Sequence, residues 1–128
     1  MSRGNILLID DEDKLRNLLK RIISLEGFIV YEADSLKAGL RQLEKEPVEV
    51  ILCDVRLPDG DGVEFIEKVK LKYPRVEMIM LTAYGNIAAG VQSMKNGAFD
   101  YLTKGNDNER IIPLLDRAME KVRLGNVK

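Results

Sequence analysis

Short apolar runs alternate along this chain with stretches whose apolar residues recur at helical spacing. The runs are bounded by acids or turn residues, which is typical of strands buried on both faces of a sheet. They lie at residues 6–9, 28–31, 48–53, 76–81 and 98–103. The other stretches keep their apolar residues three or four positions apart, which predicts amphipathic helices. These helices are expected at residues 15–23, 36–43, 63–73, 87–94 and 111–122.

A few capping and stop residues mark the helix boundaries. Ser35 is a predicted N-cap for the second helix, which should end before Pro47, and Pro74 stops the third helix. The fourth helix is the weakest element, because Gly90 lies inside it and Gly85-Asn86 precede it. It is therefore a candidate for a mobile segment.

The alternation makes five strand–helix units and predicts an α/β fold. We expect a single-domain (βα)5 architecture, in which a doubly wound, parallel, five-stranded sheet has helices on both faces. The 128 residues suit one domain. A closed eight-unit barrel would need about twice this length. The domain is expected to span residues 1–124, with 125–128 as the start of a linker or a frayed tail.

Composition excludes several classes of function. The chain has 20 basic and 21 acidic residues and a net charge of -1, so it offers no long-range attraction to nucleic acid or to an anionic membrane. It has no His, which excludes His-ligated zinc and Ser-His-Asp catalysis, and its one Cys cannot form an internal disulfide. The first residues lack the apolar stretch of a signal peptide, and no run could span a membrane. We therefore expect a soluble, cytoplasmic protein.

Reactive side chains follow four of the predicted strands. Asp10 and Asp11 follow the first strand, Asp54 the third, Thr82 the fourth and Lys104 the fifth. Because sites in open α/β sheets form outside the carboxyl ends of the strands, these groups should converge on one edge.

Clustered carboxylates, a hydroxyl and an ammonium suit phosphoryl chemistry with a hard cation. Mg²⁺ fits an all-oxygen site, and a central carboxylate such as Asp54 can act as a nucleophile and form an acyl phosphate. Each residue also has a structural explanation: Asp10 or Asp11 as a helix cap, Asp54 in an Asx-turn, and Thr82 and Lys104 as ordinary strand-end residues. Their joint placement at one edge favours the functional interpretation.

The chain resembles response-regulator receiver domains over residues 5–122. The matching segments are LLIDDE, DVRLPDGDG, MLTAYG and GAFDYLTK, at the ends of the first, third, fourth and fifth strands. The resemblance implies a flavodoxin-like receiver topology with strand order 2-1-3-4-5. Segment 83–105 is similar to receivers of the nitrogen-regulator type, whose full-length relatives carry an AAA+ module and a DNA-binding helix-turn-helix.

The resemblance implies a phosphoacceptor and a Mg²⁺ site. Asp54 would accept a phosphoryl group from a phosphohistidine on a sensor kinase or phosphotransfer protein. Asp11 would ligate Mg²⁺ directly and Asp10 through water. Asp54 and the backbone carbonyl of Arg56 would complete the protein ligands.

It also implies a conformational switch. Thr82 and Lys104 would bind the phosphoryl oxygens, and Tyr101 matches the aromatic residue that turns inward as the threonine moves. Arg56 and Tyr84 match positions that tune the lifetime of the aspartyl phosphate. The response would change the face formed by the fourth helix, the fifth strand and the fifth helix.

One position departs from the family pattern. Receivers usually have a proline after the lysine, often with a cis bond, and this chain has Gly105. Because a cis bond to a non-proline residue costs ~2.5–4 kcal/mol, we expect a trans bond or a rearranged loop at 105–108.

These observations predict a phosphorylation-activated signalling switch and not a turnover enzyme. It would act on an output domain or a partner protein, with transcription as the regulated process, and a phosphorylation-dependent homodimer is a possible assembly. The 128 residues contain no DNA-binding module, so the chain is either a stand-alone receiver or, as we favour, a fragment of a longer regulator cut near a linker. The alternative is a pseudo-receiver that acts without phosphorylation. A flavodoxin-like redox carrier is disfavoured by the acids after the first strand, and a phosphohydrolase by Arg56 two residues after Asp54.

Overall fold

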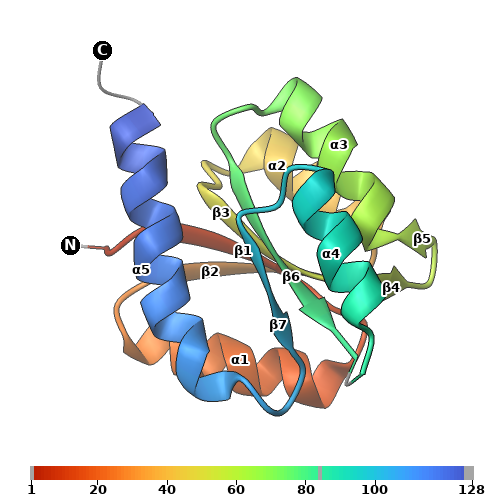
Figure 1. Ribbon diagram of the computed structural model, residues 1–128. Coiled ribbons are helices and arrows are strands. Elements are labelled where there is room, and N and C mark those ends of the chain that lie inside the picture. Colours follow the sequence, from red (N-terminus) through yellow and green to blue (C-terminus); the bar gives the residue numbers. More distant parts are fainter. Residues whose placement is uncertain (1, 84, 126–128) are drawn as a thin grey trace.

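The computed structural model describes residues 2–83 and 85–125 (Figure 1). Tyr84 and residues 126–128 lie outside this part of the chain, and so do the expectations placed on them. No helix in the described ranges is both long and apolar enough to cross a membrane.

Five parallel strands form the central sheet, in the order β2-β1-β3-β6-β7. They are β1 (Asn5–Ile9), β2 (Ile29–Ala33), β3 (Val50–Asp54), β6 (Glu77–Thr82) and β7 (Asp100–Thr103). This flavodoxin-like topology is the predicted one. The numbering differs because two further short strands, β4 (Arg56–Leu57) and β5 (Gly60–Asp61), form an antiparallel hairpin. The Pro, Asp and Gly residues of the segment LPDGDG at 57–62 predict only a turn here.

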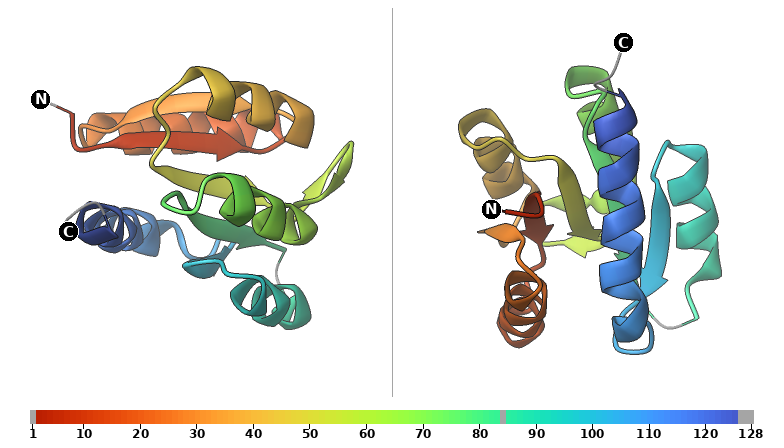
Figure 2. Two further views of the ribbon diagram at one scale, coloured as in Figure 1. Left: turned by 90° about the horizontal axis from the view of Figure 1, so that it is seen from above. Right: turned by 90° about the vertical axis from the view of Figure 1, so that its left-hand side faces the viewer.

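Within the described residues, five helices cover the two faces of the sheet, as Figure 2 illustrates. They are α1 (Asp13–Leu25), α2 (Leu36–Lys45), α3 (Gly62–Lys72), α4 (Ile87–Lys95) and α5 (Asn108–Gly125). Buried residues of α1 and α5 join the hydrophobic cluster on one face, and those of α2 and α3 join the cluster on the other. Helix α5 continues to Gly125.

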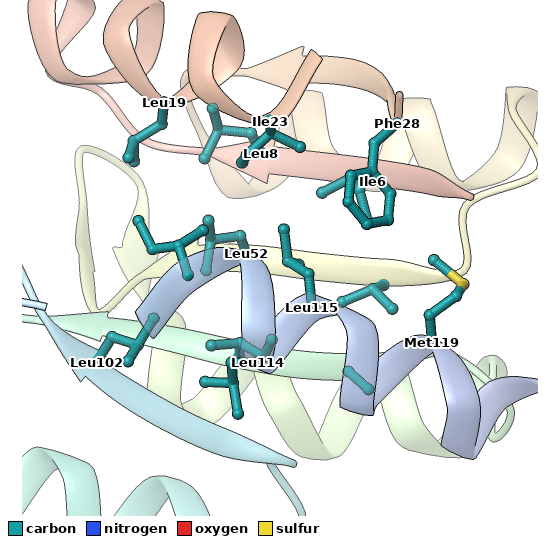
Figure 3. Close-up of a cluster of buried hydrophobic side chains, with 14 of the residues drawn as sticks. Ile6, Leu8, Leu19, Ile23, Phe28, Leu52, Leu102, Leu114, Leu115 and Met119 are labelled. Atoms are coloured by element: carbon teal, nitrogen blue, oxygen red, sulfur yellow. The ribbon is translucent and has the colours of Figure 1, made fainter. Parts of the chain in front are cut away.

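The alternation of side chains along each strand builds both clusters. Ile6 and Leu8 of β1 pack with α1 and α5, whereas Leu7 and Ile9 pack on the opposite face. Successive residues of a strand point to opposite faces, so a continuous apolar run fills two cores at once. Figure 3 shows the first cluster, in which Leu115 of α5 faces the sheet. Burying such a side chain contributes about 1.5–3 kcal/mol.

Helix α4 is present at the predicted place, but the three apolar side chains that predict it are exposed. Ile87, Val91 and Met94 are 70%, 45% and 44% exposed. The helix instead buries Gly90 and Ser93 against the rest of the domain. The helical spacing of the three apolar residues therefore marks a solvent-facing stripe on this helix.

Candidate functional site: an acidic pocket at the carboxyl edge of the sheet

The strand ends and the residues just after them place four carboxylates and one ammonium close together. The Nζ atom of Lys104 lies 2.6 Å from Oδ2 of Asp54, 3.3 Å from Oδ2 of Asp10 and 3.6 Å from Oε2 of Glu12. Asp54 ends β3, and Asp10 and Lys104 directly follow β1 and β7. Asp11 lines the acidic pocket. The predicted convergence of these groups at one edge is present in the structure.

One oxygen from each of Asp10, Asp11 and Asp54 lies within 4.8 Å of the others. Asp10 and Asp54 are buried, and Asp11 is exposed. Oδ1 of Asp10 accepts a hydrogen bond from the Glu12 N–H at 2.8 Å. Oδ2 of Asp10 has no hydrogen-bond partner, although Lys104 lies near enough for an ion pair. These three carboxylates are hard oxygen donors, and Asp10 among them has a buried oxygen without a hydrogen-bond partner. Such a group fits a small divalent cation with bound water.

Burial and charge shift the titration of this cluster. Burial raises the pKa of Asp10, and the nearby Asp54 carboxylate adds to the rise, while the Glu12 N–H and Lys104 oppose it. Burial also raises the pKa of Asp54, against the lowering effect of Lys104. Burial alone would lower the pKa of Lys104, but Asp54, Asp10 and Glu12 outweigh it, so that pKa is raised. Lys104 therefore stays charged and partly neutralises a pocket rich in carboxylates.

Thr82 ends β6 beside this pocket and is buried. Its hydroxyl donates to the carbonyl of Leu102 at 3.4 Å, and its own carbonyl accepts the Lys104 N–H at 2.9 Å. The backbone of Thr82 thus holds Lys104, while its side chain bonds to β7. Arg56 lines the pocket, and its N–H donates to Oδ1 of Asp54 at 3.3 Å.

Tyr101 of β7 is half-buried and packs against α4. A Cβ atom at Gly90 would lie 2.4 Å from a carbon of the tyrosine ring, so the ring occupies the space left by the missing side chain. The aromatic residue predicted as a switch is therefore in direct contact with the helix predicted to move.

The loop after Lys104 contains no cis peptide bond, as predicted for Gly105. Gly105 has φ +80°, a conformation that suits glycine. The carboxylate of Asp107 accepts the Thr103 N–H at 2.7 Å, and the Asp107 N–H donates to the Thr103 carbonyl at 3.2 Å. Two hydrogen bonds therefore close the loop that carries Lys104.

Sequence reasoning missed several residues that support the pocket. Arg16 of α1 donates to the carbonyl of Asp10 at 2.7 Å and also contacts Asp13 and Glu32. Asp107 closes the lysine loop. Glu12 is one of the acids expected at this edge after the first strand, but its contact with Lys104 was not predicted. The spacing of these residues gave no signal, because each contact depends on how a loop or helix folds back.

Residues 6–116 match the response regulator receiver domain family. The chain belongs to this family. The receiver is 34% identical over 123 residues to the DNA-binding transcriptional regulator NtrC of Proteus hauseri. The matched region covers 96% of this chain and 26% of that protein. The receiver is also 35% identical over 119 residues to the response regulator protein PilR of Pseudomonas aeruginosa. That matched region covers 93% of this chain and 27% of that protein. The receiver thus spans about a quarter of the length of these relatives.

Solved structures support the same assignment. The beryllofluoride-activated NtrC4 receiver domain dimer superposes with a TM-score of 0.86 and 31% identity, covering 92% of this chain and 98% of that one. The receiver domain of NtrX from Brucella abortus superposes with a TM-score of 0.85 and 28% identity, covering 90% of this chain and 98% of that one. The resemblance to nitrogen-regulator-type response regulators is confirmed. The receiver therefore belongs to the class of two-component signalling regulators, and its acidic cluster could bind a metal ion.

Proposed function

We propose that this receiver is a Mg²⁺-dependent phosphorylation switch with Asp54 as the phosphoacceptor. The observation that carries the proposal is the 2.6 Å contact between Lys104 Nζ and Oδ2 of Asp54, in a pocket that Asp11 also lines. The donor is a phosphohistidine on a sensor kinase or phosphotransfer protein.

An oxygen of Asp54 attacks the phosphorus atom and forms an acyl phosphate. The bond between phosphorus and the donor nitrogen breaks, and its electron pair stays on the imidazole, which takes a proton from solvent. Lys104 already lies beside the acceptor carboxylate, where it can neutralise charge on the phosphoryl oxygens. Asp10, Asp11, Asp54 and the Arg56 carbonyl would hold Mg²⁺. The ion would supply the remaining positive charge for the transferring group.

We expect acetyl phosphate to add one phosphoryl group to the protein in the presence of Mg²⁺, as read by intact mass. EDTA should abolish the addition because the carboxylates would then repel the incoming anion. Asp54→Asn should abolish it too, because the amide is a poor nucleophile. Asp13→Asn is the matched control and should be labelled like the wild type, since that side chain is 79% exposed. Equal labelling of the wild type and Asp54→Asn would place the acceptor elsewhere.

The proposed output is a change at α4, β7 and α5. Phosphorylation adds acceptor oxygens that attract the Thr82 hydroxyl and Lys104, which removes the hydroxyl from its bond to Leu102. Tyr101 packs directly on Gly90, so a shift of the ring changes α4. The exposed stripe of Ile87, Val91 and Met94 gives that helix an apolar surface for a partner or a second copy.

We propose that the switch regulates transcription through an output domain or effector protein. NtrC is named as a DNA-binding transcriptional regulator, and the NtrC4 receiver is described as a dimer in its activated form. A phosphorylation-dependent homodimer of this receiver is proposed on that basis. A pseudo-receiver that acts without phosphorylation is the alternative, and unlabelled wild-type protein in the acetyl phosphate experiment would favour it.

A further inference from the structure

The segment after Asp54 is a short, exposed hairpin. Strands β4 and β5 have two residues each and pair through Arg56 with Asp61 and Leu57 with Gly60. Gly60 and Asp61 are exposed. A two-stranded ladder of this length is not stable by itself in water. Contacts outside the hairpin must therefore hold it in place.

Two aspartates connect this hairpin to the N-termini of two helices. Asp61 is the N-cap of α3 and accepts the Val63 N–H at 2.8 Å, which is a local contact. Asp59, at the hairpin turn, reaches a different helix. Its Oδ1 accepts the Leu36 N–H and its Oδ2 accepts the Lys37 N–H, both at 2.9 Å.

Helix α2 already has a cap of its own. Ser35 precedes it, and its hydroxyl accepts the Ala38 N–H at 3.1 Å. Asp59 takes the two preceding N–H groups, which a helix leaves without partners in its first turn. The hydrogen bonds from the Leu36 N–H and the Lys37 N–H lower the pKa of Asp59, and the bond from Leu36 has the larger effect. The carboxylate is therefore charged at neutral pH. Asp59 is therefore a second cap that comes from a distant loop.

The same contact region includes an apolar part. Leu36 and Leu57 are both partly buried against the cluster on the α2 and α3 face of the sheet. A Cβ atom at Gly60 would lie 2.9 Å from Cδ1 of Leu36, so the hairpin backbone rests close to α2. The left view of Figure 2 shows the hairpin beside one end of α2.

A short path leads from Asp59 to the phosphoacceptor. Arg56 pairs across the hairpin with Asp61, and the Arg56 N–H donates to Oδ1 of Asp54. The Gly62 N–H donates to the Val55 carbonyl at 2.7 Å and closes the base of the hairpin. The placement of Arg56 at the pocket thus depends on where the hairpin is held.

We propose that Asp59 is a positioning residue, which binds the N-terminus of α2 and thereby fixes the β4–β5 hairpin and Arg56 beside Asp54. The link to metal binding rests on the proposed function, in which the Arg56 carbonyl is a Mg²⁺ ligand. Loss of the Asp59 contact leaves the hairpin with its local bonds only. The backbone carbonyl of Arg56 is then less ordered in the free protein. Ordering it when Mg²⁺ binds costs conformational entropy, which raises the Kd for Mg²⁺.

The test compares two caps of the same helix. Asp59→Ala removes the cap that comes from the hairpin, and Ser35→Ala removes the cap that does not touch it. Calorimetric titration with Mg²⁺ should show a Kd raised about 3- to 10-fold in Asp59→Ala. This is at or below the roughly 10- to 100-fold effect of groups that bond a metal ligand directly, because Asp59 acts on the Arg56 carbonyl only through the hairpin. Ser35→Ala should keep the wild-type Kd. Asp59→Asn retains one acceptor oxygen and should give an intermediate value.

Two further measurements separate positioning from a general loss of stability. The rate of labelling by acetyl phosphate should fall in Asp59→Ala at limiting Mg²⁺ and recover at saturating Mg²⁺. Amide exchange at Gly62 should be faster in Asp59→Ala and unchanged in Ser35→Ala. Equal effects of the two alanine variants on the Kd and on Gly62 exchange would overturn the proposal. A wild-type protein that binds no Mg²⁺ would instead contradict the proposed function, and Gly62 exchange would still decide the role of Asp59.

Discussion

At the scale of single residues, Asp10 is a buried carboxylate whose charge is incompletely compensated. It is 0% exposed, and one of its carboxylate oxygens has no hydrogen-bond partner. Lys104 lies closer to Asp54 than to Asp10, so the ammonium only partly compensates the second carboxylate. A buried charge with incomplete partners destabilises the fold unless another cation is bound.

Asp10→Asn is therefore expected to raise the free energy of unfolding by about 1 kcal/mol in metal-free buffer. The amide removes a buried charge and its repulsion from Asp54. Urea unfolding with EDTA measures this difference, and the gain should shrink in Mg²⁺ because the variant binds the ion less well. Asp13→Asn, on an exposed side chain, should change the free energy little. A variant less stable than the wild type in EDTA would contradict this account.

The pH dependence follows from the same raised pKa values. In the window from the ordinary value of 3.8 up to the raised values of Asp10 and Asp54, the folded state binds more protons than the unfolded state. These two groups therefore make stability fall as pH rises through that window and recover on acidification. Asp10→Asn should flatten this part of the profile in EDTA.

Individual residues differ in how well the sequence predicts them. Asp54, Thr82 and Lys104 could be predicted because each follows or ends an apolar run, and parallel strands bring their ends together. Asp59 and Asp107 could not, because Asp59 accepts from the first N–H groups of a distant helix and Asp107 accepts from the Thr103 N–H across a folded loop. Asp59 lies 23 residues from its partner Leu36, and nothing in the local spacing connects the two.

At the scale of elements, α4 and β7 meet through a glycine and an aromatic ring. The apolar spacing at Ile87, Val91 and Met94 correctly predicts a helix, but these side chains are exposed. The buried side contains Gly90, where the Tyr101 ring occupies the space of a side chain. From the sequence, Gly90 indicates only a weak helix, because its contact partner Tyr101 lies in strand β7.

Gly90→Ala tests this contact through the sign of its effect. Alanine favours a helix over glycine by about 1 kcal/mol, but here its methyl group must displace the Tyr101 ring, and overpacking costs about 1–3 kcal/mol. We expect the free energy of unfolding of Gly90→Ala to equal that of the wild type or to be lower. In a Tyr101→Ala background the same substitution should stabilise by about 1 kcal/mol. Urea unfolding of the four proteins measures the coupling, and equal stabilisation in both backgrounds would exclude a packed ring.

The β4–β5 hairpin shows where element prediction fails. Residues 57–62, LPDGDG, which overlap all of this hairpin but Arg56, are rich in turn residues and predict only a turn. The structure adds two pairs of strand residues, and Asp59 and Asp61 of this segment accept hydrogen bonds from the N-terminal N–H groups of α2 and α3. The five main strands, in contrast, are apolar enough to be buried on both faces, so their existence could be predicted from the sequence alone.

At the scale of the whole molecule, the amino and carboxyl ends of the parallel strands differ in the contacts that join them to the helices. Glu77, at the start of β6, is buried and pairs with Lys70 of α3 and Lys121 of α5, each at 3.3 Å. This network joins helices from both faces at the edge opposite the acidic pocket. Helix α4 instead contains a glycine and a solvent-facing apolar stripe. A response to phosphorylation is therefore expected near the pocket and α4, and not around Glu77.

Beryllofluoride with Mg²⁺, which mimics a phosphoryl group on the acceptor carboxylate, tests this expectation. The largest changes in amide chemical shift should appear at Thr82, at Lys104 and along α4 and β7, because a new ligand of the Thr82 hydroxyl competes with Leu102. Amides around Glu77 should shift least. Asp54→Asn should show none of these changes, since it lacks the acceptor carboxylate. Shifts confined to the pocket would contradict a switch that reaches α4, because the Tyr101 ring in contact with Gly90 would then move without any consequence for the helix.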